Sequence, residues 1–196
     1  MALLMIMETP GGTTDQYEKV NEIMGIRGDE DAPDGLIQHL CARSDDGVVV
    51  ADVWESQEAL DRFFEERLGA ALQQAGLGSD SPPRIMPVHN RMTGKGTEPN
   101  LLILIEADGL STDQYDQMAS RMPAHADGGS DGPWFAHTAA TKDGGIVVAD
   151  VWDSAESFGQ FAEAQIGPAA QEVGMGPIEP RMLPIHNLLN GRARVS

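Results

Sequence analysis

The sequence predicts an α+β protein of two tandem ferredoxin-like domains, each with the order β-α-β-β-α-β, whose antiparallel sheets pack into an α/β barrel within one chain. Two observations support this fold class. An internal duplication covers nearly the whole chain, and each copy repeats the same succession of strand-like and helix-like hydrophobic patterns. A chain of 196 residues can form one large domain or two small ones, and the duplication favours two.

The duplication extends over successive elements with a nearly constant register. Each copy is too long to be a solenoid repeat and is therefore expected to be a domain. We place the first domain at residues 1–93, a linker rich in glycine and polar residues at 94–100, and the second domain at 101–196. The matched stretches are LLMIMETPGGTTDQY (3–17) with LLILIEADGLSTDQY (101–115), VVVADVWES (48–56) with IVVADVWDS (146–154), and, after a slip of one residue, PRIMPVHN (83–90) with PRMLPIHN (180–187).

In the first copy, local patterns predict a strand, a helix and a hairpin. The apolar run Leu3–Met7 predicts a buried strand, and Thr14 stands where a helix N-cap is expected. The β-rich runs Leu36–Ala42 and Val48–Trp54 flank a short polar turn, which predicts a β-hairpin.

A second helix and a last strand complete the copy. Ser56 caps the helix, whose apolar stripe ends at Gly76, and the last strand is Arg84–Asn90. In the second copy Pro168 interrupts the matching helix, so we expect a kink near Gly167. Helices cover one face of such a sheet, so we expect the other copy to cover the second face and to enclose a shared cavity. The members of the apolar stripe are Leu60, Phe63, Phe64, Leu68, Ala71, Leu72 and Ala75.

Composition excludes several classes of partner and compartment. The net charge of −18 repels the phosphate backbone of nucleic acids and the surface of anionic membranes, so neither is an expected partner. The single Cys41 excludes an internal disulfide, and the apolar runs are far shorter than the roughly 20 residues of a membrane-spanning helix. Because no secretion leader is recognised, we expect a cytoplasmic protein.

The hairpin predicts a candidate catalytic pair. If Arg43 and Val48 flank the turn, His39 lies directly opposite Asp52 on the neighbouring strand. The same construction in the second copy places His137 opposite Asp150. A carboxylate beside an imidazole fixes the tautomer of the imidazole and raises its pKa, which suits a general base or a proton shuttle.

Further residues are candidates for substrate binding. Trp54 and Trp152 share a strand face with the two aspartates, because alternate residues of a strand point the same way. The last strand of each copy should bring a His-Asn pair to the cluster of its own copy, namely His89 and Asn90 in the first and His186 and Asn187 in the second.

The second copy carries more aromatic bulk near this cluster, since Trp134 and Phe135 replace Leu36 and Ile37. We expect that half of the cavity to hold a flat aromatic ligand.

Structural roles remain open for the same residues. Each His-Asp pair can equally be a satisfied buried polar pair that fixes strand register. The tryptophans can be packing residues, and the His-Asn pairs can cap the ends of their strands. Tyr17 and Tyr115 keep helical spacing with apolar neighbours, so we interpret them as core residues.

The stretches GLIQH (35–39), VVVADVWES (48–56) and PVHN (87–90), with their copies, resemble the dimeric α/β-barrel superfamily. Within it they are similar to the antibiotic biosynthesis monooxygenase-like proteins, here as a tandem, two-copy protein. Proteins of this superfamily include cofactor-free oxygenases acting on aromatic polyketides, haem-degrading enzymes, lactone isomerases and small-ligand binders.

The resemblance implies a range of activities, and two departures narrow it. Haem-degrading relatives carry an iron-ligating histidine on the second helix, whereas residues 57–75 and 155–173 contain none. Several oxygenase relatives carry a substrate-positioning asparagine on the first strand, where this chain has Glu8 and Glu106. The monooxygenase activity is therefore one candidate among several.

The expected function is that of a small-molecule enzyme of the antibiotic biosynthesis monooxygenase-like type, which performs cofactor-independent oxygenation or proton transfer on an aromatic or polyketide-like substrate. The alternatives are a non-catalytic small-ligand-binding protein and an isomerase or cyclase on the same scaffold. We expect no cofactor, because no dinucleotide-binding or Walker glycine motif follows a strand, and no metal, because no ligand spacing supports one. The chain is expected to be a pseudo-dimer by itself, with a further homodimer left open.

Overall fold

The computed structural model describes residues 1–77, 82–176 and 178–193. Its eight strands follow the hydrogen-bonding order β1-β3-β2-β8-β5-β7-β6-β4, which closes into an antiparallel barrel. This confirms the predicted α+β fold class.

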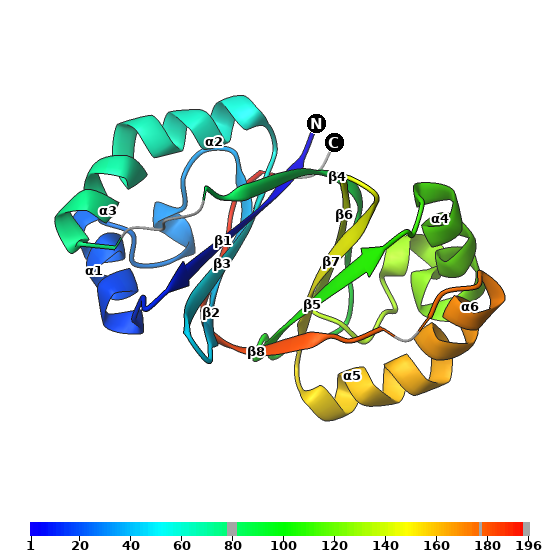
Figure 1. Ribbon diagram of the computed structural model, residues 1–196. Helices are drawn as coiled ribbons and strands as arrows, with labels where there is room; N and C mark the ends of the chain where they lie inside the picture. Colours follow the sequence, from blue (N-terminus) through cyan, green and yellow to red (C-terminus); the bar gives the residue numbers. More distant parts are fainter. Residues whose placement is uncertain (78–81, 177, 194–196) are drawn as a thin grey trace. The chain divides into compact units, whose positions relative to one another are not determined.

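The elements repeat in the same order in the two halves of the chain (Figure 1). Those of the first half are β1 (Leu3–Pro10), α1 (Thr14–Met24), η1 (Asp29–Asp31), β2 (Leu36–Ser44), β3 (Gly47–Trp54), α2 (Gln57–Phe63), η2 (Phe64–Leu68), α3 (Gly69–Ala75) and β4 (Arg84–Thr93). Those of the second half are β5 (Leu101–Asp108), α4 (Thr112–Arg121), η3 (Pro123–Gly129), β6 (Ala136–Lys142), β7 (Gly145–Trp152), α5 (Ala155–Phe161), η4 (Ala162–Ile166), α6 (Gly167–Glu172) and β8 (Arg181–Asn190).

The chain forms two compact units, which differ from the two sequence repeats. Unit 1 contains Met1–Pro87 and Ile185–Ser196, and unit 2 contains Val88–Pro184. The strands β4 and β8 therefore each begin in one unit and end in the other. Each ladder of the sheet nevertheless lies within one unit: the first half of β4 pairs with β1 and its second half with β6, while β8 pairs first with β5 and then with β2. The boundaries 1–93, 94–100 and 101–196 stay a prediction about the duplicated sequence.

Helix ends are determined by local side-chain chemistry. Thr13 caps α1 through a capping box with Gln16, so the predicted N-cap at Thr14 is wrong by one residue. Ser111 and Gln114 form the same box at α4. As predicted, the helical stretch that follows Ser56 ends at Gly76, which adopts the left-handed conformation that glycine tolerates best.

A π-helical turn interrupts the second helix of both copies, as η2 and η4. The break expected near Gly167 is thus confirmed, but the first copy shares it without a proline, and Pro168 is the second residue of α6. The wider turn changes which residues face the sheet. Phe64, expected in the apolar stripe, is 48% exposed.

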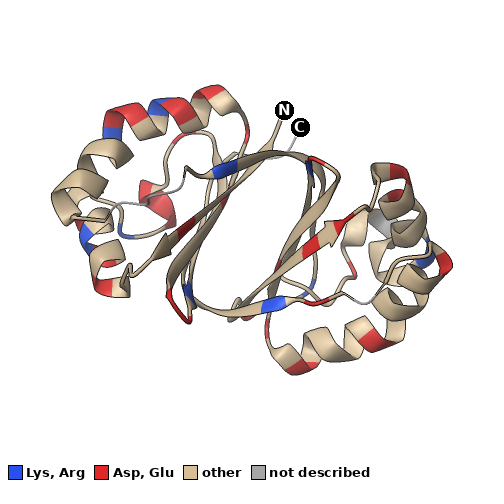
Figure 2. Ribbon diagram, in the orientation of Figure 1, with Lys and Arg blue, Asp and Glu red and all other residues tan. Residues whose placement is uncertain are grey.

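The helices of each unit lie on one face of its sheet (Figure 1), and apolar side chains fill the space between them. Within β3 the residues that point toward the helices are Val48, Val50, Asp52 and Trp54, all of them buried. Asp and Glu residues lie along the helices of both units (Figure 2). None of the helices in the described part of the chain is long and apolar enough to cross a membrane.

Candidate functional site

In unit 1 the imidazole of His39, on β2, is held between a tyrosine and a carboxylate. Its Nδ1 lies 2.7 Å from Asp52 Oδ1, and its Nε2 lies 2.7 Å from the hydroxyl of Tyr17 on α1. A carboxylate only accepts hydrogen bonds, so Nδ1 carries the proton and Nε2 accepts from Tyr17. The β2–β3 register pairs His39 with Asp52, which confirms the hairpin prediction.

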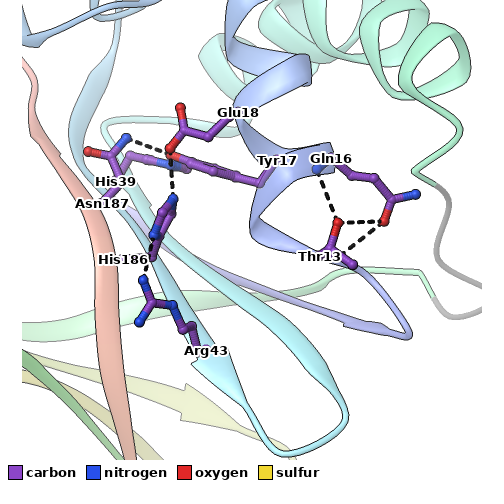
Figure 3. Close-up of polar contacts among 8 residues, drawn as sticks. All are labelled: Thr13, Gln16, Tyr17, Glu18, His39, Arg43, His186 and Asn187. Carbon is purple, nitrogen blue, oxygen red and sulfur yellow. Dashed lines mark hydrogen bonds and ion pairs between the residues drawn. The ribbon is translucent and has the colours of Figure 1, made fainter.

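Two further donors complete this hydrogen-bond chain. Asn187 Nδ2 donates to the Tyr17 hydroxyl at 2.8 Å (Figure 3), and Trp54 Nε1 donates to the second oxygen of Asp52 at 3.3 Å. Burial raises the pKa of Tyr17 above its ordinary value, so the phenol is protonated and can donate at neutral pH. The bonds therefore run in one direction, from Asn187 through Tyr17 and His39 to Asp52.

His186 lies beside this chain and is itself held on both sides (Figure 3). Arg43 Nη2 donates to its Nδ1 at 3.1 Å, so its Nε2–H donates to Glu18 Oε1 at 2.7 Å. The ring meets Tyr17 edge-on with 5.8 Å between ring centres. His186 thus helps to position the tyrosine.

Unit 2 contains the corresponding residues in a slightly different geometry. The Tyr115 hydroxyl lies 2.6 Å from His137 Nε2, and Asn90 Nδ2 donates to Tyr115 at 3.1 Å. His137 Nδ1 lies 2.8 Å from Asp150 Oδ1, but without the alignment of a hydrogen bond. The β6–β7 register pairs these two residues as predicted. His89 Nε2 lies 2.7 Å from Asp116.

The prediction that each His-Asn pair joins the cluster of its own copy is wrong. His89 and Asn90 contact Tyr115 and its helix in unit 2, and His186 and Asn187 contact Tyr17 and its helix in unit 1. The reason is the division of β4 and β8 between the units, because the second half of each strand pairs with the sheet of the other copy.

Each His-Asp pair faces the helices of its own unit, and each lines a cavity within that unit. The cavity of unit 1 measures about 50 Å³, with Tyr17, His39 and Asp52 among apolar walls. The cavity of unit 2 measures about 40 Å³ and contains Tyr115 and His137 in the same positions. The two His-Asp pairs therefore do not line the shared cavity expected from the sequence.

The predicted aromatic residues divide between lining and packing roles. Trp54 lines the cavity of unit 1, and Trp134 lines that of unit 2, whereas Phe135 is not among the lining residues. Trp152 is fully buried and packs edge-on against Phe158, so it serves the core.

His125, on η3, was not recognised in the sequence. It lines the cavity of unit 2, with its ring 5.1 Å from those of both Trp134 and His137. Burial lowers its pKa to about 4, so the ring is neutral at physiological pH. In the first copy the matching position is Arg27, so the comparison of the two copies gave no signal for His125.

The two tyrosines were also missed, because helical spacing suggested core residues. The available signal was the identical TDQY in both copies, within otherwise divergent helices. In the part of the chain that the structure describes, no cluster of three or more His, Cys, Asp or Glu side chains is arranged to hold a metal ion.

No protein-family model matches this sequence, and no curated protein is significantly similar to it. Solved structures do match. A provisionally assigned monooxygenase from Lactobacillus acidophilus is 14% identical, with 96% of each chain covered and a TM-score of 0.69. An uncharacterised ferredoxin-fold protein related to antibiotic biosynthesis monooxygenases, from Listeria monocytogenes, is 10% identical, with 95% of each chain covered and a TM-score of 0.56. An anthrone oxidase-like protein is 16% identical, covering 96% of this chain and 92% of its own, with a TM-score of 0.52. The resemblance seen in the sequence is thus confirmed at the level of the fold.

Proposed function

We propose that this chain, which shares the fold of monooxygenase-like ferredoxin-fold proteins, is a small-molecule enzyme that removes a proton from a phenol or enol of an aromatic or polyketide-like substrate. The observation that supports this best is the hydrogen-bond chain Asn187–Tyr17–His39–Asp52 at the wall of an apolar cavity. A neutral imidazole whose far side faces a buried carboxylate is a suitable general base.

In the proposed step the substrate hydroxyl gives its proton to the Tyr17 oxygen while Tyr17 gives its own proton to His39 Nε2. The imidazolium that forms is stabilised by Asp52, and Asn187 keeps the tyrosine oxygen in place. The substrate anion can then react with dioxygen, so that a ring CH₂ and O₂ become a carbonyl and water. It can alternatively rearrange without oxygen.

We propose the same roles for His137 and Asp150 in unit 2, with Asn90 holding Tyr115. His186 and His89 contact Tyr17 and Tyr115 edge-on from outside the two cavities, so we propose that they position these tyrosines. Trp54 and Trp134 supply apolar walls, whereas Phe135 and Trp152 contribute from outside the cavities. No cofactor is required for this chemistry.

The alternative of a non-catalytic binder is favoured by one observation, the small volume of the two cavities. Spaces of about 40 to 50 Å³ hold a few water molecules, so a larger ligand must displace side chains. An isomerase or cyclase uses the same base without oxygen.

The test is incubation of the purified protein with a panel of polyketide phenols under air and under nitrogen, without added cofactor. We expect a product that forms only in the presence of oxygen and is absent in the His39→Ala, His137→Ala double variant. The single variant that loses the product identifies the unit that works. Arg27→Gln, at the surface, is the matched control. Conversion under nitrogen indicates the isomerase or cyclase. Tight binding without conversion in either atmosphere would refute the enzyme and leave the binder.

A further inference from the structure

We propose that the substrate reaches the His39 site through an apolar groove on unit 1, past a gate formed by Met5, Met7 and Leu68, and that this route selects an uncharged aromatic phenol. This inference rests on the proposed function, because it names the class of substrate for that same site. It also assigns the ligand to unit 1, in contrast to the expectation that the aromatic half around Trp134 holds it.

The groove lies against the cavity that contains His39. It measures about 260 Å³, and Phe64 and Ile85 line it with exposed fractions of 48% and 39%. Met5, Met7 and Leu68 line both the groove and the cavity, so these three side chains form the wall between the two spaces. Their displacement joins the cavity of about 50 Å³ to a groove several times larger.

The three gate side chains are well suited to move. Methionine is unbranched with three rotatable bonds, and leucine is not branched at Cβ, so each can change conformation at low cost. At the matching positions unit 2 has Ile103, Ile105 and Ile166, all branched at Cβ and stiff at χ1. Unit 2 also lacks the exposed ring, because Ala162 replaces Phe64.

The π-turn helps to form the entrance. Phe64 and Leu68 are the first and last residues of η2, and Glu65 lies between them. Phe64, at the start of the turn, thus lines the exposed side of the groove, and Leu68, at the end of the turn, lines the gate. Interruptions of this kind are frequent at functional sites.

Charge at the groove indicates the class of ligand. The only ionisable side chains among its lining residues in the described part of the chain are Asp61 and Glu65. A ligand with its hydroxyl at Tyr17 extends its far end toward these carboxylates, which repel an anionic substituent there. An aromatic phenol without a carboxylate, such as a naphthol, satisfies both ends of the route.

The experiment measures binding of 2-naphthol by its fluorescence, with 6-hydroxy-2-naphthoate as the anionic partner probe. We expect one 2-naphthol per chain and an affinity about tenfold lower for the naphthoate at low salt. Asp61→Asn with Glu65→Gln should recover most of that difference. Two equivalent sites per chain, or equal affinities for the two probes, would overturn the proposal.

The gate is tested by making it resemble unit 2. Met5→Ile with Met7→Ile should lower 2-naphthol affinity at least tenfold, whereas Met5→Leu with Met7→Leu should retain it within about threefold. Thermal unfolding of both variants shows whether the fold is intact. Met182→Ile, the counterpart of Ile85 in unit 2, is the control and should leave affinity unchanged; an effect there would place the ligand in unit 2.

These outcomes separate the gate from the catalytic proposal. If 2-naphthol binding depends on the gate but no phenol is turned over, the proposed enzyme activity is refuted and the proposed access route is supported. If turnover depends on His39 but is unchanged in the Met5→Ile, Met7→Ile variant, the enzyme activity is supported and the access route is refuted.

Discussion

Removal of one tyrosine hydroxyl from each unit tests the two hydrogen-bond chains against each other. Tyr115→Phe deletes the donor to His137 Nε2 and the acceptor of Asn90 Nδ2. The His137 side chain is only 5% exposed, so bulk solvent reaches it less easily than it reaches His39. A buried polar group left without a partner costs about 1–3 kcal/mol, and because the half-buried Asn90 also loses its acceptor we expect a total loss of about 2–4 kcal/mol.

Tyr17→Phe removes the corresponding hydroxyl from unit 1 but should cost less. The His39 side chain is 15% exposed, against 5% for His137, so bulk water reaches its Nε2 more easily in place of the hydroxyl. We expect a loss of about 1 kcal/mol. At this chain length 1 kcal/mol corresponds to roughly 2–4 °C in Tm.

The assay is thermal unfolding followed by circular dichroism, with ¹⁵N chemical shifts of the histidine side chains as a second readout. Tyr17→Phe should lower Tm by about 2–4 °C and Tyr115→Phe by about 4–16 °C. In the wild-type protein His39 should carry its proton on Nδ1. The reasoning is refuted if Tyr17→Phe is as destabilising as Tyr115→Phe, or if the proton lies on Nε2 of His39.

Three further predictions concern other parts of the chain. The unfolded chain binds a proton at His125 near its usual pKa of 6.5, whereas the folded chain binds it only near pH 4, so stability falls as pH drops between these values. His125→Phe should reduce this loss of stability by on the order of 2 kcal/mol, a value that allows for partial solvent access. Urea unfolding at pH 7.5 and 4.5 measures it, and a variant with the same pH dependence as the wild type would contradict the prediction. Burial raises the pKa of the Cys41 thiol to about 12, so iodoacetamide at pH 8 should modify it only after unfolding; rapid modification of the folded protein would show that the thiol is accessible. Gly159→Ala in α5 meets no atom within 4 Å and should stabilise by about 0.5–1 kcal/mol, whereas the Cβ of Gly47→Ala would lie 2.1 Å from the Thr9 carbonyl oxygen and should cost about 2 kcal/mol or more. Chemical denaturation compares these two variants, and equal stabilities would be inconsistent with the packing described.

The pairing of each histidine with its aspartate could be predicted from the sequence because the turn of a hairpin fixes which residues lie opposite each other. Once the turn between β2 and β3 is located, the alternation of a strand determines that His39 meets Asp52. The duplication supplied a second, independent instance at His137. The fold class followed in the same way, from local patterns that agree between the copies.

The partners of the last strands could not be predicted, since PVHN and PIHN are nearly the same sequence at the two ends. Either copy of the strand satisfies the hydrogen bonds of either sheet, so composition does not distinguish Asn90 from Asn187 as the partner of Tyr17. The π-turns could not be predicted because no particular residue type marks the backbone hydrogen bonds of a π-turn. In the second copy, Pro168 suggested a cause of the break that is confined to that copy.

The division of β8 between the two units has a consequence for synthesis of the chain on the ribosome. Tyr17 is among the first residues to emerge, but its hydrogen-bond donor Asn187 follows 170 positions later. The N-terminal unit must therefore wait, with its sheet missing a neighbour for β2, until almost the entire polypeptide has been translated. The unit that is synthesised first is thus the one whose hydrogen-bond chain is completed last.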